Sequence, residues 1–236
     1  MNPYDTTPES RFQPIPIGTV DAISVFLRRA YGWMFAGLTL TGAVAVGVAG
    51  NASAVQTLVR NPMLFFGLMI AELGLVVFLS ARILKMSAAA ATASFLVYSA
   101  LNGVTLSFIF LAYTATSIAT TFFVTAGMFG ALALIGTTTK RNLSGLGSFA
   151  MMGLVGVILA SIAGMFLHSS GLQFGISVVG VIVFTLLTAY DAQKLKAMAV
   201  AGGGAGNLAI LGALALYLDF VNLFLFMLRF LGSRRN

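Results

Sequence analysis

Seven long apolar runs constrain the fold of this chain more than any other feature. A helix needs ~20 apolar residues to cross the hydrocarbon core of a bilayer. The runs are Ala30–Gly50, Met63–Ala81, Ala88–Tyr113, Thr116–Gly136, Ser148–Leu167, Leu172–Tyr190 and Ala209–Leu231. Their apolar character is continuous, whereas a lipid-facing barrel strand alternates between apolar and polar residues. The sequence therefore predicts an all-α, polytopic membrane protein with seven transmembrane helices.

Composition agrees with this class and excludes several others. Of the residues, 59% are hydrophobic and only 8% are charged, whereas soluble domains carry roughly 25% charged residues. The absence of cysteine and the single histidine leave little material for thiolate or zinc sites. The Lys and Arg side chains are scattered between the apolar runs, so the net charge of +7 indicates helix orientation and not nucleic-acid binding. The sequence shows no arrangement of a catalytic nucleophile with a general base. We therefore expect neither an enzyme nor a bound cofactor.

Polar segments frame the membrane domain and indicate its orientation. Residues 1–24 form a polar N-terminal tail, residues 25–231 the seven-helix domain, and residues 232–236 a short basic C-terminal tail. With the N-terminus in the cytoplasm, the cytoplasmic Lys and Arg are Arg11, Arg28, Arg29, Arg82, Lys85, Lys140, Arg141, Lys194 and Lys196, and the outer ones are Arg60, Arg229, Arg234 and Arg235. Because positive residues concentrate in cytoplasmic loops, this excess predicts a cytoplasmic N-terminus and an outer C-terminus. A last run that re-enters, returning the basic tail to the cytoplasm, remains an alternative.

Every acid after residue 21 falls in or at the end of an apolar run, and these acids are Glu72, Asp191 and Asp219. Asp219 lies near mid-depth, where a bare charge costs at least ~2.5–3.5 kcal/mol on insertion scales. Asp191 closes the sixth run, and a short linker makes the last two helices antiparallel neighbours. We expect the two carboxyl groups to differ in depth by roughly 5–10 Å, from the helical rise. Extension of the sixth helix past Asp191 would bring them into contact.

Helical spacing predicts that polar stripes of the last two helices face one another. These stripes are Ser177, Gly180, Phe184, Thr188 and Asp191 on the sixth helix, and Gly212, Ala215, Asp219, Asn222 and Phe226 on the seventh. Two adjacent buried carboxyl groups cannot both ionise cheaply, so we expect Asp191 and Asp219 to share one proton and form a pH-sensitive latch. Alternatively, Asp191 pairs with Lys194 or Arg82, and Asp219 is a polar contact between helices. No resident metal is predicted, although the two aspartates are a candidate site for transient calcium.

Other polar residues in the runs allow structural or functional interpretations. Glu72 either lines an ion path or is a protonated residue that is hydrogen-bonded inside the bundle. Arg82 either pairs with Asp191 or is an interfacial anchor. Asn102 is expected to form hydrogen bonds between helices, and Asn222 to line the same polar stripe as Asp219.

Several segments closely resemble the transmembrane Bax inhibitor motif family. They are 71–74 (AELG), 101–107 (LNGVTLS), 138–144 (TTKRNLS), the Tyr190-Asp191 pair, and 217–224 (YLDFVNLF) followed by Leu228-Arg229. The resemblance extends from Arg28 to Gly232, and the short tail and loops resemble those of bacterial members. Phe108 stands where some relatives have proline, so a kink at this point of the third helix is not expected.

The resemblance implies a fold and a function. Members of the family have seven helices with the last one in the centre, and bacterial relatives are pH-sensitive calcium leak pathways of the inner (plasma) membrane. Their two sensor aspartates correspond to Asp191 and Asp219, and an arginine that locks the closed state corresponds to Arg82. Calcium and protons are therefore the expected partners, besides the lipid bilayer.

The sequence is also compatible with two other functions. Some bacterial relatives bind and restrain a membrane-anchored protease, so the chain could be an interaction protein without transport of its own. A proton-coupled transporter would use the same membrane acids, but no inverted repeat is visible in the sequence.

Overall fold

Seven membrane-length helices form the computed structural model of this chain, which describes residues 17–167, 169–201 and 206–235. The spans are α1 (Ile17–Ala49), α3 (Pro62–Arg82) with the 3₁₀ turn η1 (Ile83–Lys85), α4 (Ala88–Leu106) with α5 (Ile109–Ala112), α6 (Ala115–Thr138), α7 (Ser144–Leu167), α8 (Ser170–Val200) and α9 (Gly206–Leu231). A short helix, α2 (Ala52–Arg60), connects α1 to α3. The prediction of an all-α polytopic membrane protein is confirmed. Residues 1–16 of the predicted N-terminal tail, and Asn236, lie outside the described residues.

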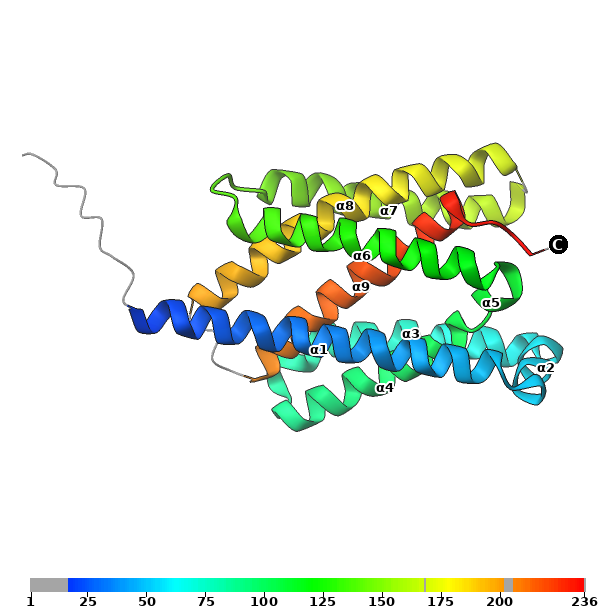
Figure 1. Cartoon of the computed structure of the whole chain (residues 1–236), viewed down its shortest axis with the longest axis horizontal. Helices are drawn as coiled ribbons and strands as arrows, with labels where there is room; N and C mark the ends of the chain where they lie inside the picture. Colours follow the sequence, from blue (N-terminus) through cyan, green and yellow to red (C-terminus); the bar gives the residue numbers. More distant parts are fainter. Residues whose placement is uncertain (1–16, 168, 202–205, 236) are drawn as a thin grey trace, which may run out of the picture.

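The last helix occupies the centre of the bundle. In Figure 1, α9 crosses diagonally between one group of helices, α6 to α8, and another, α1, α3 and α4. It packs against α1, α4, α6 and α8. Within an 18-residue apolar stretch of α9, 67% of the residues are buried, whereas the corresponding share for the span of α3 is 6%. At 26 residues α9 is ~39 Å long, which is enough to cross the bilayer as the sequence predicts.

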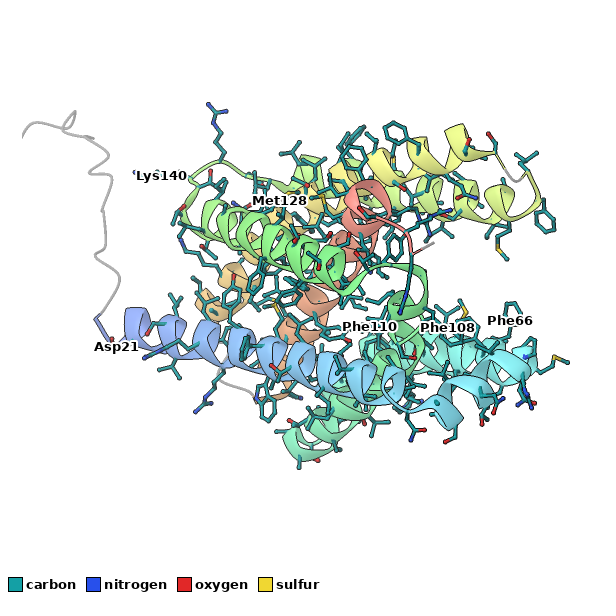
Figure 2. All side chains as sticks on the ribbon, turned by 45° about the vertical axis from the view of Figure 1, so that its right-hand side comes forward. Asp21, Phe66, Phe108, Phe110, Met128 and Lys140 are labelled. Atoms are coloured by element: carbon teal, nitrogen blue, oxygen red, sulfur yellow. The ribbon has the colours of Figure 1, made fainter. Side chains whose placement is uncertain are left out.

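The two ends of the bundle are called here the N-side and the C-side. The N-side holds the start of α1, the α6–α7 turn and the start of α9, and the C-side holds α2, α5 and the C-terminal segment. Figure 2 shows Asp21 and Lys140 at the N-side and Phe66 and Phe108 at the C-side. The outward faces of α3 and α7 are apolar, as Ile70, Leu73 and Leu159 show by being more than half exposed. These faces are suited to lipid.

Helix α8 continues well past Asp191, which lies inside the helix and not at its end as expected. Polar contacts with the end of α6 and with the α6–α7 turn stabilise this extension. The Gln193 side chain donates to the Arg141 carbonyl at 2.8 Å and accepts from the Leu143 amide at 2.8 Å. Lys196 Nζ donates to the Thr137 carbonyl at 2.6 Å. The sixth span therefore extends beyond its apolar run, because neighbouring carbonyl groups satisfy its polar side chains.

Two further boundaries differ from the expectations. Helix α1 begins at Ile17, before the expected start of the membrane domain at residue 25. The regular α-helix of the third span is interrupted at Ser107 and Phe108 although the span lacks proline, while both residues keep right-handed helical backbone angles. Ser107 Oγ donates to the Val104 carbonyl at 2.6 Å. Such local side-chain bonds compete with the helical backbone ladder and bend helices.

Candidate functional site

Asp191 of α8 and Asp219 of α9 meet in the interior of the bundle. Their carboxyl groups are direct neighbours that act on one another electrostatically. Asp219 is only 4% exposed, and no N–H or O–H group in the described part of the chain donates to its buried Oδ2 atom. Two ionised carboxylates have no proton with which to form a hydrogen bond, whereas one shared proton satisfies both. The geometry therefore allows the proton sharing that the sequence predicts.

The polar stripes of α8 and α9 pack face to face around this pair. A Cβ atom added to Gly180 of α8 would collide with the ring of Phe226 of α9, and one added to Gly212 of α9 would collide with Leu195 of α8. Phe184 and Phe226 stack with ring centroids 5.7 Å apart. Small residues thus let the two backbones approach closely on either side of the acid pair. We call this contact the α8–α9 seam.

Two cavities adjoin the seam, one on each side of the acid pair along α9. The N-side cavity has a volume of about 100 Å³ and is lined by Asp191, Lys194, Leu195, Met198, Leu211, Gly212 and Ala215. The C-side cavity has about 640 Å³, and its polar lining residues are Tyr113, Ser161, Gln173, Asn222, Arg229 and Arg234. Between Ala215 and Asn222 the helical rise amounts to ~10 Å, and Asp219 lies in this interval. The acid pair therefore stands in the layer that separates the cavities.

The cation nearest to Asp191 is Lys194, one turn further along α8, which acts on its carboxyl group electrostatically. Arg82 is exposed at the end of α3, and within the described residues no ion pair joins it to Asp191. The adjoining turn η1 is nevertheless tied to α9, because Asn207 Nδ2 donates to the carbonyls of Ile83 and Leu84 at 3.3 and 3.1 Å. Of the two partners expected for Asp191, this conformation places Lys194 and not Arg82 beside it.

Glu72 and Asn102 belong to a second polar network on another face of α9. Thr105 Oγ1 donates to Glu72 Oε1 at 2.7 Å, and Asn102 Nδ2 lies 3.5 Å from Oε2. Tyr217 Oη donates to Asn102 Oδ1 at 3.2 Å and lies 2.7 Å from the Thr41 hydroxyl. The network therefore joins α1, α3, α4 and α9. Glu72 is separate from the acid pair, and its hydrogen bonds match the interpretation of a residue bonded inside the bundle.

Tyr217 and Thr41 were not identified as functional candidates from the sequence. An aromatic residue in an apolar run is usually a core residue, and Tyr217 is indeed fully buried against Phe95 and Tyr98. The only available signal was its phenol, because a buried hydroxyl group needs a hydrogen-bond partner.

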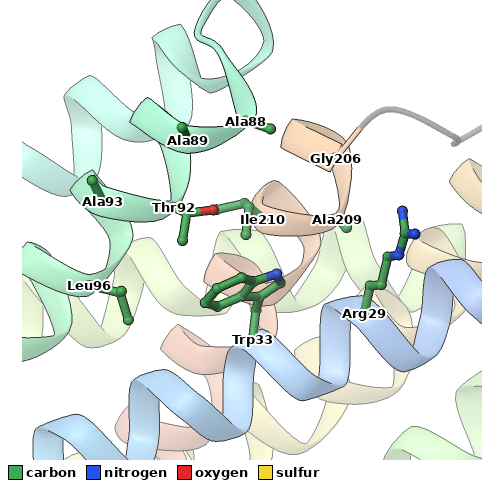
Figure 3. A pocket seen from close by; sticks show the side chains of 10 residues that line it. All are labelled: Arg29, Trp33, Ala88, Ala89, Thr92, Ala93, Leu96, Gly206, Ala209 and Ile210. Atoms are coloured by element: carbon green, nitrogen blue, oxygen red, sulfur yellow. The ribbon is translucent and has the colours of Figure 1, made fainter.

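A third cavity of about 570 Å³ lies between α1, α4 and α9 at the N-side (Figure 3). Figure 3 shows the Trp33 indole in its centre and Arg29 towards one end. The α4 wall consists mostly of small side chains, including Ala88, Ala89 and Ala93. These residues supply few polar groups, and the cavity does not include either aspartate of the pair.

Within the described residues, no three or more His, Cys, Asp or Glu side chains form a group that could hold a metal ion. The pair of carboxyl groups supplies oxygen ligands of the kind that calcium prefers, but fewer than the six to eight oxygens of a stable site. Any calcium at this pair would complete its shell with water or backbone carbonyls.

Fold and site together define a polytopic membrane bundle whose central helix carries a buried acid paired with its neighbour. The family model described as "Inhibitor of apoptosis-promoting Bax1" matches residues 23–236, and the chain belongs to this Bax inhibitor-like family.

Among its relatives is "Inner membrane protein YbhL" of Escherichia coli (strain K12), 51% identical over 218 residues that cover 90% of this chain and 93% of the relative. An uncharacterized protein of Borreliella burgdorferi is 44% identical over 215 residues, covering 89% and 93% of the two chains. One from Deinococcus radiodurans is 42% identical over 219 residues, covering 92% and 94%. With its seven membrane-length helices, the chain is a multi-pass protein of the inner membrane.

Proposed function

We propose that this protein is a pH-sensitive, calcium-permeable leak channel of the inner membrane, and that the Asp191–Asp219 pair is its gate. The observation that carries the proposal is the position of the pair between the N-side and C-side cavities. A path along the α8–α9 seam would have to pass these two carboxyl groups. The membership in the Bax inhibitor-like family supports the same function.

The chemistry of the pair gives the direction of the pH response. At low pH one shared proton ties α8 to α9, and the seam is closed. As pH rises this proton is lost, and two like charges in a medium of low dielectric constant repel each other. Separation of the helices would join the two cavities, while the paired carboxylates would attract a divalent cation. We therefore expect calcium flux to increase between pH 6 and pH 8.

The test is calcium flux into proteoliposomes that contain the purified protein, measured from pH 6 to pH 8. Asp219→Asn keeps a hydrogen bond to Asp191 but cannot ionise, so the ratio of flux at pH 8 to flux at pH 6 should fall towards one. Asp191→Asn should have the same effect. Asp21→Asn is the matched control, because Asp21 is an exposed acid outside the pair and its loss should leave the ratio unchanged.

Two results would refute the gate. The first is an unchanged pH dependence of the flux in both Asp219→Asn and Asp191→Asn. The second is an absence of flux at every pH from correctly folded wild-type protein, which would favour an interaction protein without transport.

A further inference from the structure

The C-side cavity is lined by two arginines and by uncharged polar groups. Arg229 lies in the last turn of α9, and Arg234 follows it in the C-terminal segment. Both residues also line an adjoining pocket of about 430 Å³, together with Ser170, Gln173 and Ser177 of α8. Two guanidinium groups, a carboxamide and two hydroxyl-bearing residues therefore surround one continuous region at this end of the bundle.

The structure positions the Arg229 side chain and the backbone around Arg234, both at exposed positions. The Arg229 guanidinium lies over the ring of Phe226, 5.9 Å from the ring centroid. The C-terminal segment is fixed by backbone contacts: the Arg235 amide donates to the Ala112 carbonyl at 3.0 Å, and the Ser233 amide donates to Ser117 Oγ at 2.9 Å. Arg234 pairs with Tyr113 in an isolated bridge between these contacts. The segment is thus anchored beside the cavity, which Tyr113 and Arg234 both line.

No acidic side chain of the described residues neutralises these arginines through an ion pair. Glu72, on the nearby α3, accepts hydrogen bonds from Thr105 and Asn102. Asp219, three residues before the cavity-lining Asn222, is next to Asp191. Each guanidinium group carries five N–H donors in a planar fork that matches the oxygens of phosphate or carboxylate.

We infer that the C-side cavity binds an oxyanion, a phosphate group, through Arg229 and Arg234. The phosphate belongs either to the headgroup of an anionic phospholipid or to a free anion. A consequence that rests on the proposed channel function concerns permeation. Two positive charges that have no ion-pair partner among the described residues repel an approaching calcium ion, and a bound phosphate removes this barrier. The anion would then be a positive regulator of calcium flux.

Binding is tested on the purified full-length protein in a phosphate-free detergent. The probes are inorganic phosphate, followed by ³¹P NMR line broadening, and short-chain phosphatidylglycerol as a competitor. The double substitution Arg229→Gln with Arg234→Gln should weaken phosphate binding at least about tenfold, because both charge-assisted contacts are lost. Arg60→Gln is the control, since Arg60 is exposed at the same end of the bundle but outside this cavity. Its binding should equal that of the wild type.

A second variant separates binding from misfolding. Arg229→Lys retains the charge but loses the planar fork, and should weaken binding by about threefold. Competition by phosphatidylglycerol would identify a lipid headgroup as the source, and its absence a free anion. Equal binding by wild type, the double variant and Arg60→Gln would overturn the site, as would an absence of binding by both probes.

The regulatory consequence has its own readout. Flux is compared in liposomes of phosphatidylcholine with and without phosphatidylglycerol, or with and without phosphate if only the free anion binds. Flux that does not respond to a bound anion would overturn the regulation and leave the binding site standing. A wild-type protein that binds the anion but conducts no calcium in any condition would instead overturn the proposed channel function.

Discussion

At the scale of single residues, the Tyr217 hydroxyl is the member of the second polar network that joins the central helix to α1 and α4. Tyr217→Phe removes the donor to Asn102 and the partner of Thr41 without changing the shape of the core. Hydrogen bonds between membrane helices are worth about 0.6 kcal/mol on average and up to about 1.7 kcal/mol. We expect the variant to lose about 1–2 kcal/mol of unfolding free energy, measured by reversible unfolding in mixed micelles.

Tyr98→Phe provides the comparison for this prediction. Tyr98 is also buried, and its ring packs against that of Tyr217 with centroids 5.8 Å apart, but it takes part in none of the hydrogen bonds of the network. Removal of the Tyr98 hydroxyl should therefore cost clearly less unfolding free energy than removal of the Tyr217 hydroxyl. An equal cost for the two variants would show that the network does not stabilise the bundle.

Some residues of the candidate site could be predicted from the sequence and others could not. An acid at mid-depth of an apolar run is conspicuous because it is expensive, so Asp219 could be found, and helical spacing indicated the side on which it faces Asp191. Tyr217 and Thr41 could not be found in this way, since either residue is unremarkable in an apolar helix. Which of Lys194 and Arg82 lies beside Asp191 depends on how α3 packs, and periodicity within one helix carries no such information.

At the scale of elements, α6 and α8 approach closely at Gly136. A Cβ atom at this position would collide with the backbone carbonyl of Ala189 and meet the Ala192 side chain at 3.0 Å. Backbone atoms cannot move aside as the end of a flexible side chain can. Gly136→Ala should therefore push α6 from α8 and cost about 1–3 kcal/mol, the usual range for overpacking, measured as a decrease in thermal stability in detergent.

Gly130→Ala is a suitable control on the same helix, because nothing lies within 4 Å of a Cβ atom there. It should be neutral or slightly stabilising, since alanine has the higher helix propensity. If Gly136→Ala were as stable as Gly130→Ala, the close contact between α6 and α8 would not contribute to the fold.

Apolar length predicted the seven spans but not their ends. The runs indicate where a chain can lie in hydrocarbon, and each one coincides with a span. The continuation of α8 past Asp191 depends instead on Gln193 and Lys196 finding carbonyl partners on another element. Helix α2 lies outside every apolar run, and Asn51 caps it by accepting from the amides of Ser53 and Ala54. Such boundaries follow from local polar contacts, which hydropathy does not register.

At the scale of the whole molecule, the two ends of the bundle carry different charges, and this difference predicts its orientation. The N-side holds most of the Lys and Arg, including Lys140 in the α6–α7 turn, whereas the C-side holds few, including Arg60 in α2. Because positively charged loops are retained in the cytoplasm, the N-side should be cytoplasmic. The proposed path would then admit calcium at the C-side cavity and discharge it beside Asp191.

This orientation can be measured directly because the chain contains no cysteine. Single substitutions Lys140→Cys and Arg60→Cys place one thiol at each end of the bundle, both at exposed positions. A membrane-impermeant maleimide should label Arg60→Cys in spheroplasts and label Lys140→Cys only after the membrane is opened. The reverse pattern would place the N-side outside, so that calcium would enter at the N-side cavity instead. Labelling of both variants, Arg60→Cys and Lys140→Cys, in intact spheroplasts would indicate dual insertion, and the charge difference would then not determine the topology.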